Sequence, residues 1–208
     1  THTPAREAGL SFATDNRTLA YASERGGNWQ LYLAKIARKE DANFPTATLI
    51  EEEVLLPSTT VERAYPQFSP DGKMLAIAAS GEAFNKIGLK IAPGQTSNMA
   101  DGQLFLYDPA SKQANPVTKD FNPSVQNFVW NKGDKQIYLQ GEDKDCVRLY
   151  VLNPSTGKIL PIPLKEDILS DFTIAETTPE LVYFGESASN SQRLYSVNLK
   201  KKSSVCLK

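Results

Sequence analysis

The sequence is poor in the side chains on which most active sites depend. Its 208 residues include one histidine, His2, and it has no Gly-x-Ser-x-Gly segment. A serine hydrolase needs a nucleophile, a base and an orienting acid, and its nucleophile often sits in such a segment. Because His2 lies at the terminus, no base is placed to activate a serine. We therefore expect no catalytic residues, and the sequence predicts that this chain alone is not an enzyme.

Cysteine is almost as scarce, since only Cys146 and Cys206 are present. Neither lies in a Cys-x-x-Cys pair or a Cys/His cluster, so no zinc site is expected. Whether the two form a disulfide is left open by the sequence, because the distance between their Cα atoms decides it. The acidic segment 142–145 lacks the glycine and the bidentate glutamate of a calcium loop. It is typical of a solvated hairpin tip, and we expect neither a metal nor a cofactor.

Long apolar runs and an excess of one charge are also absent. No segment approaches about 18 apolar residues, so no membrane span is predicted. No signal peptide or lipidation motif is visible. The 23 Lys and Arg against 24 Asp and Glu give a net charge of −1, which provides no attraction to nucleic acid. The basic run 200–202 is typical of a solvated turn.

Internal repetition is the strongest positive feature. The clearest copy, 65–79, has a strand that ends in an aromatic residue, a Ser-Pro-Asp-Gly turn and a second apolar strand. In that turn proline presets φ, aspartate bonds back to the backbone and glycine accepts a positive φ. Weaker copies of this pattern occupy 10–23, 127–139 and 171–184.

Each copy is followed by a third strand with a polar residue and then alternating apolar positions. These strands are 29–34, 103–108, 148–153 and 193–198, and a fourth, outer strand follows, such as 158–162. Helical periodicity is not sustained anywhere, so the chain is predicted to be all-β. The first strands end at the anchors Phe12, Phe68, Trp130 and Ile174. The first two intervals between anchors exceed the about 40–50 residues of a propeller blade, which predicts insertions at 38–48 and 83–101.

Four-stranded units of this kind predict a β-propeller. One small twisted sheet cannot bury both faces alone, whereas radial stacking buries each face against its neighbours. The prediction is a single propeller segment, 1–208, with approximate blades at 8–50, 51–118, 119–164 and 165–208. Repeats this diverged favour membership of a larger ring of six to eight blades. The inner strands should supply the core, with these residues buried: Phe68, Leu75, Ile77, Trp130, Ile137, Tyr138, Leu149 and Tyr183.

Neither terminus offers a spare strand to close a ring, so an open or incomplete ring is expected. The faces of the terminal blades would then be apolar and exposed, and such patches mark association surfaces. We expect further blades, another copy or another subunit to cover them. These faces are formed around Phe12, Leu19 and Tyr21 in the first blade and around Val182, Phe184 and Tyr195 in the last.

The segment 68–73, Phe-Ser-Pro-Asp-Gly-Lys, resembles the core repeat of TolB-type propellers. Similar repeats build the N-terminal propellers of prolyl-oligopeptidase and dipeptidyl-peptidase-type serine peptidases and of tricorn-like proteases. Segment 130–135 lies where such peptidases have Trp-Ser-Pro-Asp-Gly-Lys, and 22–32 resembles a tricorn-like hairpin. Fold does not fix function, however, because this fold carries many unrelated activities.

The resemblance implies a non-catalytic propeller segment of an exported protein, periplasmic or otherwise in the cell envelope. Its role would be recognition of a protein or peptide, or gating of a peptidase domain absent from this chain. Two alternatives stay open: a TolB-like periplasmic protein-interaction scaffold, and a propeller lyase acting on oligosaccharides. The single histidine argues against the lyase.

Candidate ligand-binding residues come from a hairpin shoulder and from the second insertion. An aromatic residue at a hairpin shoulder can stack on a ligand, and long loops on rigid β scaffolds often carry function. The candidates are Trp29, Phe84, Gln95 and Asn98. The acidic run 51–53 suggests the acidic pair that grips a substrate amine in dipeptidyl peptidases, but no aromatic residues precede it. We expect instead an exposed loop, or an edge strand whose charges discourage edge pairing.

Overall fold

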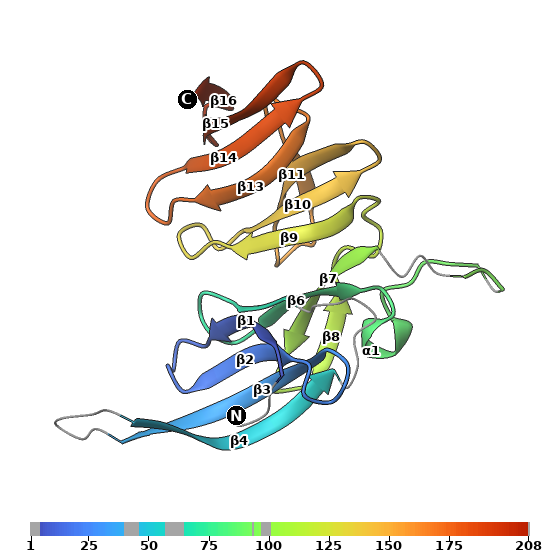
Figure 1. Cartoon of the computed structure of the whole chain (residues 1–208), viewed down its shortest axis with the longest axis vertical. Coiled ribbons are helices and arrows are strands. Elements are labelled where there is room, and N and C mark those ends of the chain that lie inside the picture. The colour runs from blue at the N-terminus through green and yellow to red at the C-terminus, as the bar shows by residue number, and fades with distance from the viewer. Residues whose placement is uncertain (1–4, 40–45, 57–64, 93, 97–100, 208) are drawn as a thin grey trace. The chain divides into compact units, whose positions relative to one another are not determined.

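The computed structural model describes residues 5–39, 46–56, 65–92, 94–96 and 101–207. Their regular secondary structure is almost entirely β-strand. The chain divides into two compact units, with the boundary in the sequence between Asp120 and Phe121. Each unit contains two antiparallel groups of four strands, in which every strand pairs with the next along the chain (Figure 1). This meander is the arrangement that four short strands joined by tight turns are expected to adopt.

The first unit contains two separate four-stranded sheets. The first sheet comprises β1 (Glu7–Phe12), β2 (Thr18–Ser23), β3 (Gln30–Lys39) and β4 (Thr46–Leu56). The second sheet comprises β5 (Tyr65–Phe68), β6 (Leu75–Ser80), β7 (Gly102–Asp108) and β8 (Gln113–Pro116), with the short helix α1 (Ala83–Lys86) between β6 and β7.

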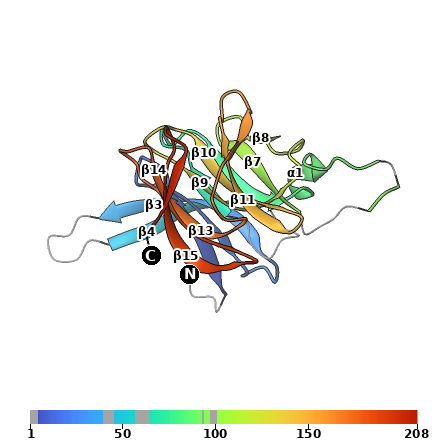
Figure 2. The same cartoon turned by 90° about the horizontal axis from the view of Figure 1, so that it is seen from above.

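The second unit repeats the meander twice, and the two groups are joined. The third group comprises β9 (Ser124–Trp130), β10 (Ile137–Asp143), β11 (Cys146–Leu152) and β12 (Ile159–Ile162). The fourth group comprises β13 (Ile168–Ile174), β14 (Glu180–Ser187), β15 (Asn190–Asn198) and β16 (Ser203–Cys206). A parallel pairing of Val147 with Ile168 links β11 to β13, so the eight strands form one continuous sheet. Figure 2 shows the same strands from above.

The repeat-derived predictions for the strands are confirmed. The anchors Phe12, Phe68, Trp130 and Ile174 are the last residues of β1, β5, β9 and β13. The four third strands and the outer strand at 158–162 are also present, as β3, β7, β11, β15 and β12. The tip at 142–145 joins β10 to β11, and the basic run 200–202 forms the turn between β15 and β16. The residues that favour tight turns lie between these strands in the sequence and so determine where the strands end.

The core of each unit lies between its two consecutive four-stranded groups. In the first unit, Leu31 and Leu56 pack with Leu75, Ile77 and Phe105 of the second sheet. In the second unit, Tyr138 and Leu149 pack with Leu169, Leu181 and Tyr183 of the fourth group. All eight residues predicted for the core are buried, which confirms the alignment of the repeats.

The extra residues predicted at 38–48 take the form of a lengthened hairpin where the structure describes them. β3 continues to Lys39 and β4 begins at Thr46, and the two strands pair from end to end. The boundary predicted at 50 consequently falls inside β4, which runs on to Leu56. The added residues lengthen the β3–β4 hairpin, because their backbone groups pair with those of the neighbouring strand.

The predicted exposure of the terminal faces is correct for the phenylalanines and wrong for the tyrosines. Phe12 and Phe184 are 51% and 44% exposed. Tyr21 and Tyr195 are buried, however. Tyr195 pairs with Tyr183 across β14 and β15, so both rings lie on the face opposite Phe184 and belong to the core. Leu19 and Val182 are half-buried.

Both cysteines are free; Cys146 is half-buried and Cys206 is exposed. The structure therefore contains no disulfide between them. Among the residues that the structure describes, no helix is long and apolar enough to cross a membrane.

Candidate functional site

The predicted ligand-binding residues do not converge on one place. Trp29 lies just before β3, half-buried, with the Arg6 guanidinium 5.9 Å from its ring centroid. Phe84 packs on Phe105 and Tyr107, with ring centroids 5.3 and 5.8 Å away. It is thus part of the packing around the first core, although a positive φ places it in a tight turn.

The remaining two candidates lie in the second predicted insertion. Gln95 is exposed, and its Oε1 accepts a hydrogen bond from the backbone N–H of Ala92 at 3.3 Å. Asn98 falls outside the described residues. Ligand binding by Trp29, Phe84, Gln95 and Asn98 stays a prediction.

The acidic run 51–53 lies in the edge strand β4, as expected, and each carboxylate has a partner. Glu51 pairs with Lys35 at 2.7 Å, and Glu53 reaches Lys112 of the second sheet at 2.9 Å. Glu52 accepts hydrogen bonds from Arg25 and from the Tyr21 hydroxyl. Because all three carboxylates have partners within the first unit, their contacts stabilise that unit's own structure.

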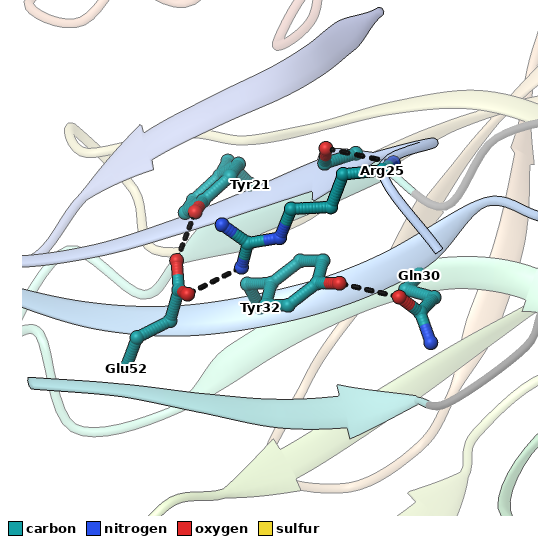
Figure 3. A network of polar contacts seen from close by, with 6 residues as sticks. Tyr21, Arg25, Gln30, Tyr32 and Glu52 are labelled. Atoms are coloured by element: carbon teal, nitrogen blue, oxygen red, sulfur yellow. Dashed lines mark hydrogen bonds and ion pairs between the residues drawn. The ribbon is translucent and has the colours of Figure 1, made fainter. Parts of the chain in front are cut away.

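The partners of Glu52 form a cluster on one face of the first sheet, which we call the Arg25 cluster: Tyr21, Arg25, Gln30, Tyr32 and Glu52. Tyr21 and Tyr32 are direct cross-strand partners, and their rings stack with centroids 5.4 Å apart. The Arg25 guanidinium lies over the Tyr32 ring, 3.8 Å from its centroid, as Figure 3 shows. Such contacts between a guanidinium and a ring face are attractive.

The Arg25 cluster is an ion pair whose polar groups are hydrogen-bonded to one another. Glu52 takes a hydrogen bond from each of Tyr21 and Arg25, and the Tyr32 hydroxyl donates to Gln30 (Figure 3). Burial and the neighbouring Glu52 carboxylate raise the pKa of Tyr21, so its phenol stays protonated as a donor. With its members bonded to one another, the cluster offers a surface for contact and no reactive group.

The rim of the Arg25 cluster is apolar. Phe12 pairs with Leu19, and Tyr32 pairs with Val54, which places these side chains on the same face as the two tyrosines. Phe12 and Val54 are 51% and 47% exposed. Tyr and Arg surrounded by exposed apolar side chains are typical of protein-binding surfaces. Repeat analysis missed this cluster, although the Leu-Tyr step at the start of each third strand except β7 gave a signal for it.

A second feature is a cavity in the second unit. It lies among the β9–β10, β13–β14 and β15–β16 turns and has a volume of about 310 Å³. At its base, the backbone of Gly133 lies against the Glu176 carbonyl: a Cβ at residue 133 would be only 1.7 Å from that oxygen. The two turns therefore touch through their backbones, and glycine is required at this approach.

Comparison with known proteins shows which fold the chain has. No family model matches the sequence. Dipeptidyl-peptidase 5 of Porphyromonas gingivalis is 24% identical over an alignment of 173 positions, which covers 79% of this chain and 22% of that protein. TolB from Acinetobacter baumannii superposes with a TM-score of 0.63 at 14% identity, over 98% of this chain and 44% of TolB. The fold is that of a β-propeller.

A propeller from a protease is similar as well. The β-propeller domain of the Trilobed protease from Pyrococcus furiosus has a TM-score of 0.56 at 14% identity, over 98% of this chain and 69% of that domain. These findings confirm the predicted all-β propeller fold and its resemblance to TolB-type and peptidase propellers. The chain spans less than a quarter of the curated relative and less than half of TolB.

Proposed function

We propose that this chain is a non-catalytic propeller segment of an exported cell-envelope protein that recognises a protein or peptide. Where a peptidase domain accompanies it, the segment would also gate access to that domain. The peptidase part of the proposal rests on the likeness to a dipeptidyl-peptidase and to the propeller of a protease. The cell-envelope placement rests on the resemblance to TolB-type propellers.

The observation that carries the recognition role is the face of the Arg25 cluster. An arginine that lies over one of two stacked tyrosines, with Phe12 and Val54 exposed beside it, combines a polar centre with an apolar rim. The exposed area comes from Phe12 and Val54, and the tyrosines are buried beneath Arg25 and Glu52. Exposed apolar side chains beside an arginine are typical of partner-binding surfaces.

A TolB-like scaffold that binds a folded protein is the second candidate, and the exposed phenylalanine and valine of this sheet face favour it. The oligosaccharide-lyase alternative depended on metal-binding histidines. Within the described ranges, no group of three or more His, Cys, Asp or Glu is placed to hold a metal ion, so nothing described there supports it.

Two measurements on the purified chain test the proposal. Incubation with a fluorophosphonate probe and with dipeptidyl p-nitroanilides should give no labelling and no turnover. Turnover that disappears when one of the chain's own serines is replaced would contradict the non-catalytic role.

The second measurement is affinity selection from a random peptide library, with Phe12→Ser as the test variant and Lys35→Ser as an exposed control on the same sheet. We expect wild type and the control to retain the same peptides and Phe12→Ser to lose them. If wild type enriches no peptide, a panel of folded envelope proteins decides between the scaffold candidate and rejection of the recognition role.

A further inference from the structure

The cavity of the second unit is built from turns that the fold brings together at one end of the third and fourth groups. Figure 1 shows the β9–β10 and β13–β14 turns on the same side of this unit. Asn131 and Asp134 come from the first of these turns, and Glu176 and Pro179 from the second. Lys200 comes from the β15–β16 turn. Residues up to 69 positions apart in the sequence thus share one volume.

The β9–β10 wall is fixed by its own hydrogen bonds. Asn131 is 5% exposed, and its Oδ1 accepts from the Gly133 N–H at 3.2 Å. Asp134 accepts from the Gln136 N–H at 3.0 Å and from the Tyr138 hydroxyl at 2.6 Å. Burial and the Asp134 carboxylate raise the pKa of Tyr138, so this phenol remains a donor. A wall held in this way needs little reordering when a ligand arrives.

The charges around the cavity are of both signs. Among the residues that line it, Asp134 and Glu176 are acidic and Lys200 is basic. Lys132 lies 3.7 Å from Glu176 and partly balances it, whereas Asp134 is bonded to neutral donors. A cation is therefore favoured near Asp134, and an anion is favoured near Lys200. Pro179 and Leu199 add an apolar side to the same volume.

Size limits what could bind. At about 310 Å³, the cavity is at the small end of the range for ligand sites in proteins. A ligand that carries an ammonium group at one end, a carboxylate at the other and a short apolar side chain matches both the size and the charges. We propose that this cavity binds a small zwitterion of amino-acid or dipeptide size, with its ammonium group on Asp134 and its carboxylate on Lys200. The proposal rests on the proposed function in taking peptides as the ligand class.

Calorimetric titration with three related probes tests it. The dipeptide Ala-Leu carries both charges, N-acetyl-Ala-Leu lacks the ammonium group, and Ala-Leu amide lacks the carboxylate. We expect Ala-Leu to bind and each blocked form to bind at least about tenfold more weakly, the loss expected when a charge-assisted hydrogen bond is removed. Absence of Ala-Leu binding, or equal binding of all three, would overturn the proposal.

Variants locate the site. Asp134→Asn should weaken Ala-Leu about tenfold but leave N-acetyl-Ala-Leu unchanged. Lys200→Gln should weaken Ala-Leu and leave Ala-Leu amide unchanged. Asp145→Asn and Lys201→Gln, which change exposed charges outside the cavity lining, are the matched controls and should bind as wild type does. Circular dichroism of each variant verifies folding.

The two proposals fail in different ways. If library peptides bind the chain but the cavity variants do not alter Ala-Leu binding, the cavity proposal is wrong and the recognition role stands. If Ala-Leu binds and responds to Asp134→Asn and Lys200→Gln while longer peptides and folded proteins do not bind, the cavity proposal stands and the recognition role is wrong.

Discussion

The first sheet and the fourth group of strands carry the same pair of tyrosines in two different settings. In each sheet the second strand and the third strand contribute directly opposed tyrosines, Tyr21 with Tyr32 and Tyr183 with Tyr195. Both pairs stack almost alike, with centroids 5.4 and 5.1 Å apart and interplanar angles of 20° and 19°. The local motif therefore produces the same pair twice.

The settings differ in what covers the pair. Tyr183 and Tyr195 lie in the core between the third and fourth groups, packed with Leu149 and Leu169. Tyr21 and Tyr32 form a separate small cluster, and Arg25 and Glu52 close over it. Arg25 and Glu52, which we call the polar lid, thus cover the first pair, whereas a neighbouring group of strands covers the pair in the second unit. The comparison shows that the repeat determines the tyrosine pair, while its surroundings determine whether neighbouring strands or polar side chains bury it.

The largest effect should come from removing a ring on the covered side. Tyr183→Ala should lower the free energy of unfolding by about 3–5 kcal/mol, because it leaves a cavity in a packed core. Tyr21→Ala should cost about half as much, since the rings there can shift toward solvent. Urea denaturation measures both losses, with Trp29 and Trp130 fluorescence reporting the first and second units. Equal losses would contradict the distinction between the two settings.

The contact between turns in the second unit should be the next most sensitive. Gly133→Ala should cost about 1–3 kcal/mol, because the new methyl group meets the Glu176 carbonyl and the backbone must move. Ser155→Ala, at an exposed turn of the same unit, is the control and should stay within about 0.5 kcal/mol of wild type. Thermal unfolding distinguishes them, and an unchanged midpoint for Gly133→Ala would show that the turns are not in contact.

The polar lid of the first sheet should contribute less. Arg25→Ala removes the contact with the Tyr32 ring and the pairing with Glu52, and should cost about 1–2 kcal/mol. Lys35→Ala removes only an exposed pair with Glu51 and should cost less than about 0.5 kcal/mol. Chemical denaturation of the two variants compares them. Similar losses for both would mean that the lid is an ordinary surface ion pair.

The smallest expected effect on stability concerns Glu166, the carboxylate that is hydrogen-bonded to Tyr195. Glu166 is buried and accepts from the Tyr195 hydroxyl at 2.6 Å, and this bond holds its pKa below the usual value. The same bond raises the pKa of Tyr195 to about 12. A lowered carboxyl pKa stabilises the fold above the unfolded-state pKa, and that stability is lost as pH falls through the folded-state value.

Stability of the second unit should therefore decline as pH falls below about 5. In Glu166→Gln that decline should be smaller, because no carboxyl group titrates at this position. Thermal midpoints between about pH 6 and pH 3 for both proteins measure the difference. Parallel profiles would show that Glu166 does not contribute to the acid sensitivity.

Repeat analysis succeeded wherever one residue decides its own local geometry. Gly72 has a φ of +74°, and Asp71 accepts from Ser69 and from the Lys73 N–H, so the Ser-Pro-Asp-Gly turn forms as its residues predict. The anchor Phe68 is the last residue of β5 for the same reason. The prediction that the inner strands supply the core was also correct, and β6 is buried at every position.

The failures share one cause. The repeats showed that residues are added at 38–48, but not that they lengthen the β3–β4 hairpin, because their partners on the opposite strand decide that. Tyr195 was assigned to the exposed face because cross-strand register decides which side chains share a face, and register is not visible in one strand alone. The Arg25 cluster and the cavity were missed because they gather residues from separate strands or turns.

The sequence by itself determined the turns, the strand order within each four-stranded group and the residues of the core, because these depend on neighbours along the chain. Only the tertiary structure decided which groups bury each tyrosine pair, that Glu52 pairs with Arg25, and that Asp134 and Lys200 line one cavity. Those outcomes depend on register and on packing between sheets, in which residues far apart in the sequence compete for the same few ångströms of space.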